Sequence, residues 1–304
     1  MTMIVGYPPD RRGRAALDLA GMLARSAGDD LVVACVVPAP WTPGMARVDA
    51  EYRERLDAIA DAALDEARAE RPPGPETSFV RYAAQSAPAG LLELVEKHSA
   101  RFLVVGSSSA GVFGHVVLGS VSDRLLHSSP VPVALAPRGL RCDPGATVSR
   151  VSVAYGGPSA EQLVESAAVV AGGVGASLRL VSFAVWSRPA YTTTLGTDSE
   201  DLVFQQWTAQ ILEKAGATLA GVGDLQRPPS DLEFAIGRGE SWREAIDDIE
   251  WVEGDVLVVG SSPLGPLSRV FLGSHATKIV RHSPVPVVVV PRGGEARLAQ
   301  STGT

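Results

Sequence analysis

Short apolar runs alternate with longer amphipathic segments along the chain. Runs such as Leu31–Val37 and Leu178–Val185 lack strict polar alternation, which is typical of strands that helices cover on both faces of a parallel sheet. The predicted strands are 2–6, 30–37, 77–82, 102–106, 131–136, 151–155, 177–185, 231–235, 256–260 and 285–290. Helical patterns lie at 15–27, 48–70, 89–99, 160–171, 202–219 and 242–251. This alternation predicts an α/β fold built from βαβ units.

The second half of the chain repeats the first. Residues 103–139 and 257–293 align without a gap, and about half of their positions are identical. The beginnings of the halves share an order of strand, turn, helix and strand. Such a duplication predicts two domains, as does the length, since single domains cluster at about 100–150 residues. We place the first domain at 1–139, a linker at 140–149, the second domain at 150–294 and a tail at 295–304.

The closing strand of each half carries a proline inside an apolar run, in SPVPVALAP and SPVPVVVVP. Proline removes a ladder donor and favours a sheet edge. An edge as apolar as Val287–Val290 would be prone to aggregation if it stayed bare. We therefore expect the two closing strands to pair about a pseudo-twofold axis within one chain. A loop that covers each edge is the alternative.

A Gly/Ser-rich loop follows the fourth predicted strand of each half and leads into a helix. Glycines let the backbone approach a ligand closely, and the free N–H groups and partial positive charge of a helix start attract an anion. The loops are candidate phosphate sites, and a tight turn with an N-cap serine is the structural alternative. The candidate binding residues are Gly106, Ser109, Gly111, Gly119, Ser120, Gly260, Gly265, Gly273 and Ser274.

The spacing of these loops resembles the G-x2-G-x9-G-[ST] motif of universal stress proteins. Gly106 and Gly119–Ser120, like Gly260 and Gly273–Ser274, keep that spacing, and SSPVPVALAPRG and HSPVPVVVVPRG are similar to the family's closing strand. The resemblance covers both halves and identifies a tandem member. It implies two parallel five-stranded sheets of order 3-2-1-4-5, flanked by helices and related by a pseudo-twofold axis. It also implies ATP or another adenine nucleotide as a ligand.

The implied strand order places a crevice between the first and fourth strands of each half, where open α/β sheets bind ligands. The loop after the first strand forms the other wall of each crevice, through Tyr7, Pro8, Tyr155 and Gly156. ATP-binding members of the family carry an aspartate at the positions of Pro8 and Gly156. The second motif glycine is replaced by Ser109 and Pro263, and proline has no N–H to offer a phosphate. We therefore expect weak nucleotide binding, and weaker binding in the second half.

Composition and charge exclude several classes of protein. A net charge of −7 and a pI near 5.3 argue against nucleic-acid and anionic-membrane partners, which clustered Lys and Arg would grip. No apolar run approaches the roughly 18 residues of a membrane helix, and the first residues lack a signal peptide's apolar core. We expect a cytoplasmic protein. Cys35 and Cys142 have neither a disulfide framework nor metal-ligand spacing, so no metal is predicted.

Catalytic patterns are missing from the sequence. It has no P-loop and no G-x-S-x-G elbow. Its five histidines form no paired ligand spacing, so we assign the histidines to helix ends or to the surface. The two glycine loops contain Arg269 as their one charged residue and no carboxylate that could hold a metal beside phosphates. We assign the polar segment 186–200 to a surface excursion rather than a lid. We predict a stress-response binding module, not an enzyme, with no catalytic residues. The alternatives are a nucleotide-free scaffold for a protein partner and a slow ATPase. The sequence leaves open whether two chains form a homodimer.

Overall fold

The computed structural model describes residues 1–9, 13–39, 46–108, 113–156, 160–186, 197–223, 225–261 and 273–291. The elements of the first half are β1 (Thr2–Gly6), α1 (Gly13–Ala27), β2 (Asp30–Pro38), α2 (Ala46–Ala69), β3 (Thr77–Ala84), α3 (Ala87–Lys97), β4 (Phe102–Gly106), α4 (Ser120–Ser128) and β5 (Val133–Ala136). Those of the second half are β6 (Arg150–Ala154), α5 (Glu161–Val174), β7 (Ser177–Val185), α6 (Thr197–Gly223), β8 (Leu232–Gly239), α7 (Trp242–Asp247), β9 (Asp255–Gly260), α8 (Ser274–His282) and β10 (Val287–Val290).

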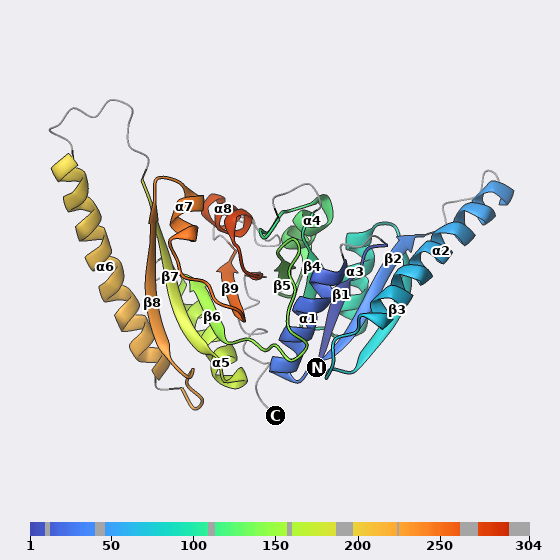
Figure 1. The fold of residues 1–304 in the computed structure, drawn as a ribbon, viewed down its shortest axis with the longest axis horizontal. Coiled ribbons are helices and arrows are strands. Elements are labelled where there is room, and N and C mark those ends of the chain that lie inside the picture. Colours follow the sequence, from blue (N-terminus) through green and yellow to red (C-terminus); the bar gives the residue numbers. More distant parts are fainter. Residues whose placement is uncertain are drawn as a thin grey trace.

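One continuous sheet joins the two halves (Figure 1). Among the described residues its ten strands run in the order β3-β2-β1-β4-β5-β10-β9-β6-β7-β8. The order 3-2-1-4-5 is thus confirmed in both halves, and the strands within each half are parallel. Parallel neighbours need helical crossovers, which explains the strand and helix alternation in the sequence.

The closing strands meet at the centre of this sheet. β5 and β10 pair antiparallel, with Val133 opposite Val289, Ala134 opposite Val288 and Leu135 opposite Val287. This pairing confirms the expected intramolecular pseudo-dimer and leaves no role for a covering loop at these edges. Both strands begin after the second proline of the S-P-V-P segment, two residues later than predicted, because a proline cannot donate to the ladder. The prolines therefore delay the strands rather than leave them at an edge of the whole sheet.

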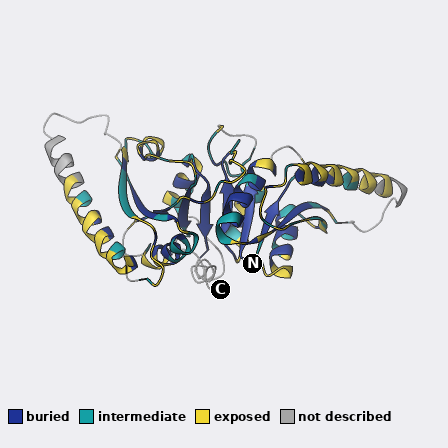
Figure 2. Cartoon of the chain, turned by 60° about the horizontal axis from the view of Figure 1, so that its bottom comes forward, coloured by how far each residue is buried: buried dark blue, intermediate teal, exposed yellow. Residues whose placement is uncertain are grey.

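Helices cover both faces of the sheet in two layers. α1, α2, α5 and α6 pack on one face, and α3, α4, α7 and α8 lie on the other. Successive strand residues serve opposite faces, as Ile4 and Val5 do. Each apolar core runs through both halves of the chain. Figure 2 shows buried strands between layers whose outermost helices, α2 and α6, expose their outer faces.

Some predicted boundaries are wrong at helix ends. α7 ends at Asp247 rather than at Trp251, since the Trp251 indole N–H turns back and donates to the carbonyl of Ile246 at 2.9 Å. α6 begins at Thr197, so 197–200 are helical rather than part of the predicted excursion. Residues 187–196 of that excursion lie outside the described part of the chain.

Buried charges near the amino ends of the strands differ between the halves. In the first half the Arg101 guanidinium lies 3.0 Å from the Asp29 carboxylate. In the second half Asp255 accepts hydrogen bonds from Arg150 Nε at 2.7 Å and Nη2 at 2.8 Å, and Arg179 Nη2 lies 3.5 Å away. Arg101 and Asp255 occupy the same position of the repeat. The duplication thus preserved the fold while the sign of a buried charge changed.

The Cys142 thiol lies half-buried in the segment after β5. Burial, with a smaller contribution from Asp18, raises its pKa from 9.0 to about 11. A rise of this size lowers the reactive thiolate fraction at pH 8 about 100-fold. We expect iodoacetamide to alkylate Cys142 at pH 8 about 100-fold more slowly in the folded protein than in urea, as measured by peptide mass spectrometry. Equal rates would contradict the burial of the thiol.

Candidate functional site

The first candidate crevice lies at the carboxyl ends of β1 and β4. These strands are neighbours, with Met3 opposite Phe102 and Val5 opposite Val104. Gly6 ends one strand and Gly106 the other, so the chain leaves both strands at the same edge of the sheet. A Cβ on Gly6 would lie 3.1 Å from both Leu91 and Val105 side chains. The wall is therefore tightly packed beside the crevice.

Serines hold the loop after β4. Ser107 Oγ donates to the Ala136 carbonyl at 2.6 Å and accepts from the Val117 N–H at 3.1 Å. The Ser108 N–H donates to the Val117 carbonyl at 2.8 Å. The two ends of the loop are thereby tied to each other and to β5. Ser109 and Gly111, two of the predicted site residues, lie outside the described residues.

Gly119 and Ser120 form the start of α4, as predicted. The N–H of the N-cap residue Gly119 donates to Ser122 Oγ at 2.8 Å, and a Cβ at Gly119 would lie 3.2 Å from the Ser108 Cβ. The N–H groups of exposed Ser120 and half-buried Val121 belong to the first turn, where a helix supplies no acceptor. These two donors can face an anion. Asp123, exposed in the same turn, places a negative charge beside them.

The strand-one wall contains Pro8, while the Tyr7 ring lies elsewhere. A Cβ on Gly13 would come 2.4 Å from the Tyr7 ring, so this ring is buried under the start of α1 in the core between α1 and the sheet. Burial, followed by the charges of Glu66 and Glu70, raises the pKa of Tyr7 to about 12. Tyr7 thus contributes its backbone, and not its ring, to the wall of the crevice. Pro8 is half-buried.

The second candidate crevice lies between β6 and β9 in the corresponding place. The Tyr155 ring is buried, and its hydroxyl lies 3.2 Å from Thr218 Oγ1. Gly156 is exposed, and a Cβ there would meet no atom within 4 Å. Gly260 ends β9, and Gly273 precedes α8, which begins at Ser274. Gly265 and Pro263 lie outside the described residues.

An aromatic group beside the start of α8 was missed by sequence reasoning. The rings of Trp242 and His275 lie 5.2 Å apart between centroids, and Phe183 lies 6.3 Å from Trp242. Lys278 Nζ is 5.7 Å from the Trp242 ring centroid. The group joins β7, α7 and α8, and the signal for it was the tryptophan at the first position of the predicted helix 242–251. The group places aromatic ring surface and the Lys278 ammonium near the start of α8.

Two other histidines contact carbonyl groups near helix ends. His127 Nδ1 lies 2.7 Å from the carbonyl of Asp123 within α4. His115 Nδ1 lies 3.2 Å from the His282 carbonyl, across the junction of the halves. Burial, and then the charges of Arg243 and His115, lowers the pKa of His282. His127 and His282 lie in the last turns of α4 and α8, in agreement with the assignment to helix ends, whereas His115 is half-buried at the junction of the halves, which that assignment did not include.

Neither a metal centre nor a membrane span emerges from the described ranges. No three His, Cys, Asp or Glu side chains in them are grouped so that they could hold a metal ion. None of their helices combines the length and apolar character needed to cross a bilayer.

Comparisons with known proteins agree with this architecture. The family model described as the universal stress protein family matches residues 1–137 and 147–291. A universal stress protein of Mycobacterium tuberculosis and one of Mycobacterium bovis are each 40% identical over 96% of this chain and 100% of their own length. A solved universal stress protein from Archaeoglobus fulgidus superposes with a TM-score of 0.60 at 19% identity, over 96% of this chain and 98% of that chain. A putative universal stress protein from Pseudomonas aeruginosa gives 0.59 at 15% identity, over 100% and 98%.

Proposed function

Because this chain belongs to the universal stress protein family, with one match in each half, we propose that it is a cytoplasmic stress-response binding module that takes an adenine nucleotide weakly in its first crevice. The supporting observation is the start of α4. There the first-turn N–H groups of Ser120 and Val121 lie at the end of a loop that Ser107 and Ser108 hold in place. An anion is attracted to such a helix start by donors and by the helix dipole.

The affinity is low on this proposal. A helix start contributes about 0.3–1 kcal/mol toward an exposed anion, and Gly106–Ser120 contains no Lys or Arg. The Gly119 N–H is engaged by Ser122, and the Asp123 carboxylate repels phosphate. Pro8 also lacks a side-chain acceptor for the adenosine end. We therefore assign dissociation constants in the millimolar range.

The first crevice binds more tightly than the second on this proposal, because Ser109 keeps the N–H that Pro263 lacks. Isothermal titration with ATP, ADP, AMP and cyclic AMP at millimolar concentration tests binding itself. Crystals soaked in the best ligand test the ranking. Heat from none of the four would remove the proposal, and equal or reversed occupancy would remove the ranking.

Gly119→Asp should strongly weaken nucleotide binding in the first crevice. The new side chain would crowd Ser108 and place a carboxylate beside the helix start. We expect at least a tenfold loss of affinity, on the order of 1.4 kcal/mol, in the same titration. Gly145→Asp is the matched control, since it adds the same charge where a Cβ meets no atom within 4 Å. Unchanged binding by Gly119→Asp would show that α4 does not hold the phosphate.

A nucleotide-free scaffold for a protein partner is the second candidate. It is favoured by the engaged Gly119 N–H and by Pro8 and Gly156 at the aspartate positions. A slow ATPase would instead release phosphate above a control without protein, and Ser120→Ala would remove that release.

A further inference from the structure

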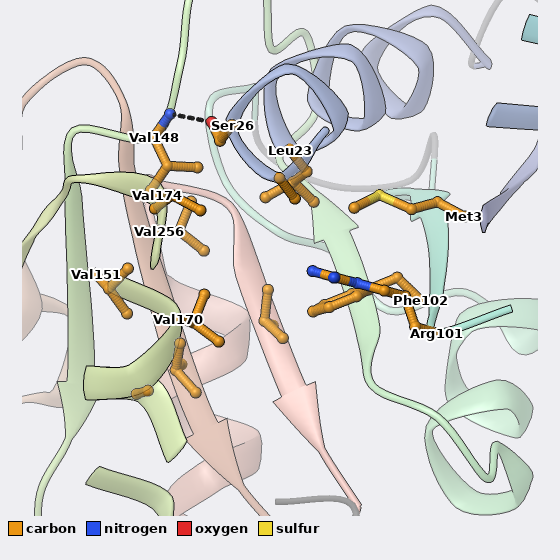
Figure 3. A pocket seen from close by; sticks show the side chains of 14 residues that line it. Met3, Leu23, Ser26, Arg101, Phe102, Val148, Val151, Val170, Val174 and Val256 are labelled. Atoms are coloured by element: carbon orange, nitrogen blue, oxygen red, sulfur yellow. Dashed lines mark hydrogen bonds between the residues drawn. The ribbon is translucent and has the colours of Figure 1, made fainter. Parts of the chain in front are cut away.

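A small apolar cavity of about 50 Å³ lies between the two halves, on the face of the sheet covered by α1 and α5 (Figure 3). The side chains around it come from both halves and include Met3, Leu23, Phe102, Val151, Val170 and Val256. Arg101 also reaches toward the cavity, but its guanidinium lies 3.0 Å from the buried Asp29 carboxylate. The cavity thus offers mainly apolar contacts, and the charge that could attract a partner lies on the opposite face of the sheet.

On that opposite face, α8 carries a row of basic side chains. His275, Lys278 and Arg281 are exposed, and His282 is half-buried. Because successive helix residues turn by about 100°, these four side chains project within about 120° of one another around the helix. Among the residues that the structure describes, Lys278 and Arg281 form no ion pair. The row is therefore a cationic surface on a chain whose net charge is −7.

The neighbouring helix α7 adds a third cation to this row. Burial lowers the pKa of His282, and the charge of Arg243 lowers it further, whereas the charge of Asp247 raises it. Both α7 side chains are exposed and lie close enough to the row to act on it. The carboxylates of Glu244 and Asp248 instead accept hydrogen bonds from the backbone N–H groups of residues 240 and 238. Three cations thus oppose one carboxylate in this basic patch.

The basic row is specific to the second half. At the same positions of the repeat, α4 has Asp123 in place of Thr277 and His127 in place of Arg281. One arginine and one aspartate therefore balance in α4, whereas α8 contains Lys278 and Arg281 and no acidic residue. Since α4 occupies the corresponding place without an excess of charge, the fold does not require the basic row of α8.

A tryptophan ring borders the row. Trp242 is half-buried at the first position of α7, with its ring centroid 5.2 Å from that of His275 and 5.7 Å from Lys278 Nζ. The first half has Ala87 at the corresponding position, directly after the N-cap serine of α3. A ring face beside cations is typical of protein interfaces, in which Trp and Arg are enriched.

We propose that α8 and the start of α7 form a docking surface for an acidic segment of a protein partner. Carboxylates of the segment face Lys278 and Arg281, which are one helical turn apart, and an apolar side chain lies against Trp242. Charge complementarity favours such a segment, whereas nucleic acid needs many phosphate contacts and one short helix offers few. The surface uses side chains rather than the N–H groups of a helix start, so it does not depend on the proposed nucleotide site.

An acetylated and amidated EDLEDL peptide titrated into the full chain tests the proposal through the indole N–H signals in NMR spectra. The Trp242 signal should shift, and that of Trp207, which packs on the opposite face of the sheet, should not. The uncharged peptide QNLQNL should bind about tenfold more weakly, and raising NaCl from about 50 to about 300 mM should weaken EDLEDL binding. Equal binding of the two peptides, or an unmoved Trp242 signal at millimolar EDLEDL, would overturn the proposal.

Reversing the charge of Lys278 and Arg281 together, by Lys278→Glu and Arg281→Glu, should weaken EDLEDL binding about tenfold or more. Lys97→Glu with Arg124→Glu is the matched control, because it makes the same change in charge at exposed positions of the first half, where Lys97 Nζ also lies 6.0 Å from a ring centroid, that of Tyr82. Equal losses in the two double variants would overturn the assignment to α8. A short single-stranded DNA that binds more tightly than EDLEDL would overturn the partner class. Self-association of the parent chain that the α8 variant loses would assign the surface to a second copy instead.

Discussion

Residues 1–143 produced without the second half should form a homodimer or an aggregate. In the full chain, the outer edge of β5 pairs with β10 through Val133, Ala134 and Leu135, all of which are buried. Removing β10 exposes these apolar side chains and a row of unpaired backbone groups, which is a template for another strand. A second copy of β5 offers the same antiparallel pairing. Light scattering coupled to size-exclusion chromatography at micromolar concentration measures the mass.

Co-expression of residues 144–304 provides the control. The two fragments should associate into a complex with the mass of the intact chain, because they restore the β5 and β10 pair and both shared cores. A well-behaved monomer of residues 1–143 would show that the β5 edge is protected in some other way. The pairing would then be a consequence of the covalent connection rather than a requirement of each half.

Asp255→Asn should destabilise the second half by about 3–5 kcal/mol, because removing one partner of a buried ion pair leaves the other charge uncompensated. Asp255 is 1% exposed and faces both Arg150 and Arg179. Arg179 is itself buried, with its guanidinium 4.9 Å from the Trp251 ring centroid. Burial lowers the pKa of Arg179, because its guanidinium has lost most of its contact with water. Urea unfolding at pH 7 measures the free energy change.

Glu233→Gln is the matched control for this charge cluster. Glu233 contacts the same Arg150 at 3.3 Å, but its side chain is 39% exposed. An exposed ion pair contributes about 0–1 kcal/mol, so we expect a loss below 1 kcal/mol. Similar losses in the two variants would mean that water reaches the cluster and that the Asp255 ion pairs contribute no more to stability than an exposed pair.

The resemblance to a known family made the strand order predictable, and the repeated apolar closing strands made the central pairing predictable. Each half contains the same succession of apolar runs, and the second half confirmed the interpretation of the first at every strand. The ends of strands and helices were less predictable where a single side chain overrides the periodic pattern of apolar residues. Pro132 and Pro286 postpone the closing strands, and the Trp251 indole ends α7 through a contact that no periodicity encodes.

The candidate site was predictable in position and not in detail. Gly106, Gly119 and Ser120 lie where their spacing placed them, at the end of β4 and the start of α4. The capture of the Gly119 N–H by Ser122 depends on a side-chain rotamer, and the burial of the Tyr7 ring depends on the path of the chain into α1. The neighbourhood of Trp242 and His275 depends on the packing of α7 against α8. Such tertiary contacts cannot be predicted from the spacing of residues along the sequence alone.

Because the two halves are joined in one chain, the surfaces where they meet do not have to be identical. In a dimer of identical subunits, every residue near the twofold axis must tolerate its own copy across that axis. Here the equivalent positions hold Arg101 and Asp255, and Met3 corresponds to Val151. Each substitution needs to suit only one environment, so the two halves can diverge separately while the β5 and β10 ladder keeps them in one body. The central cavity is therefore an asymmetric space that identical subunits would not build.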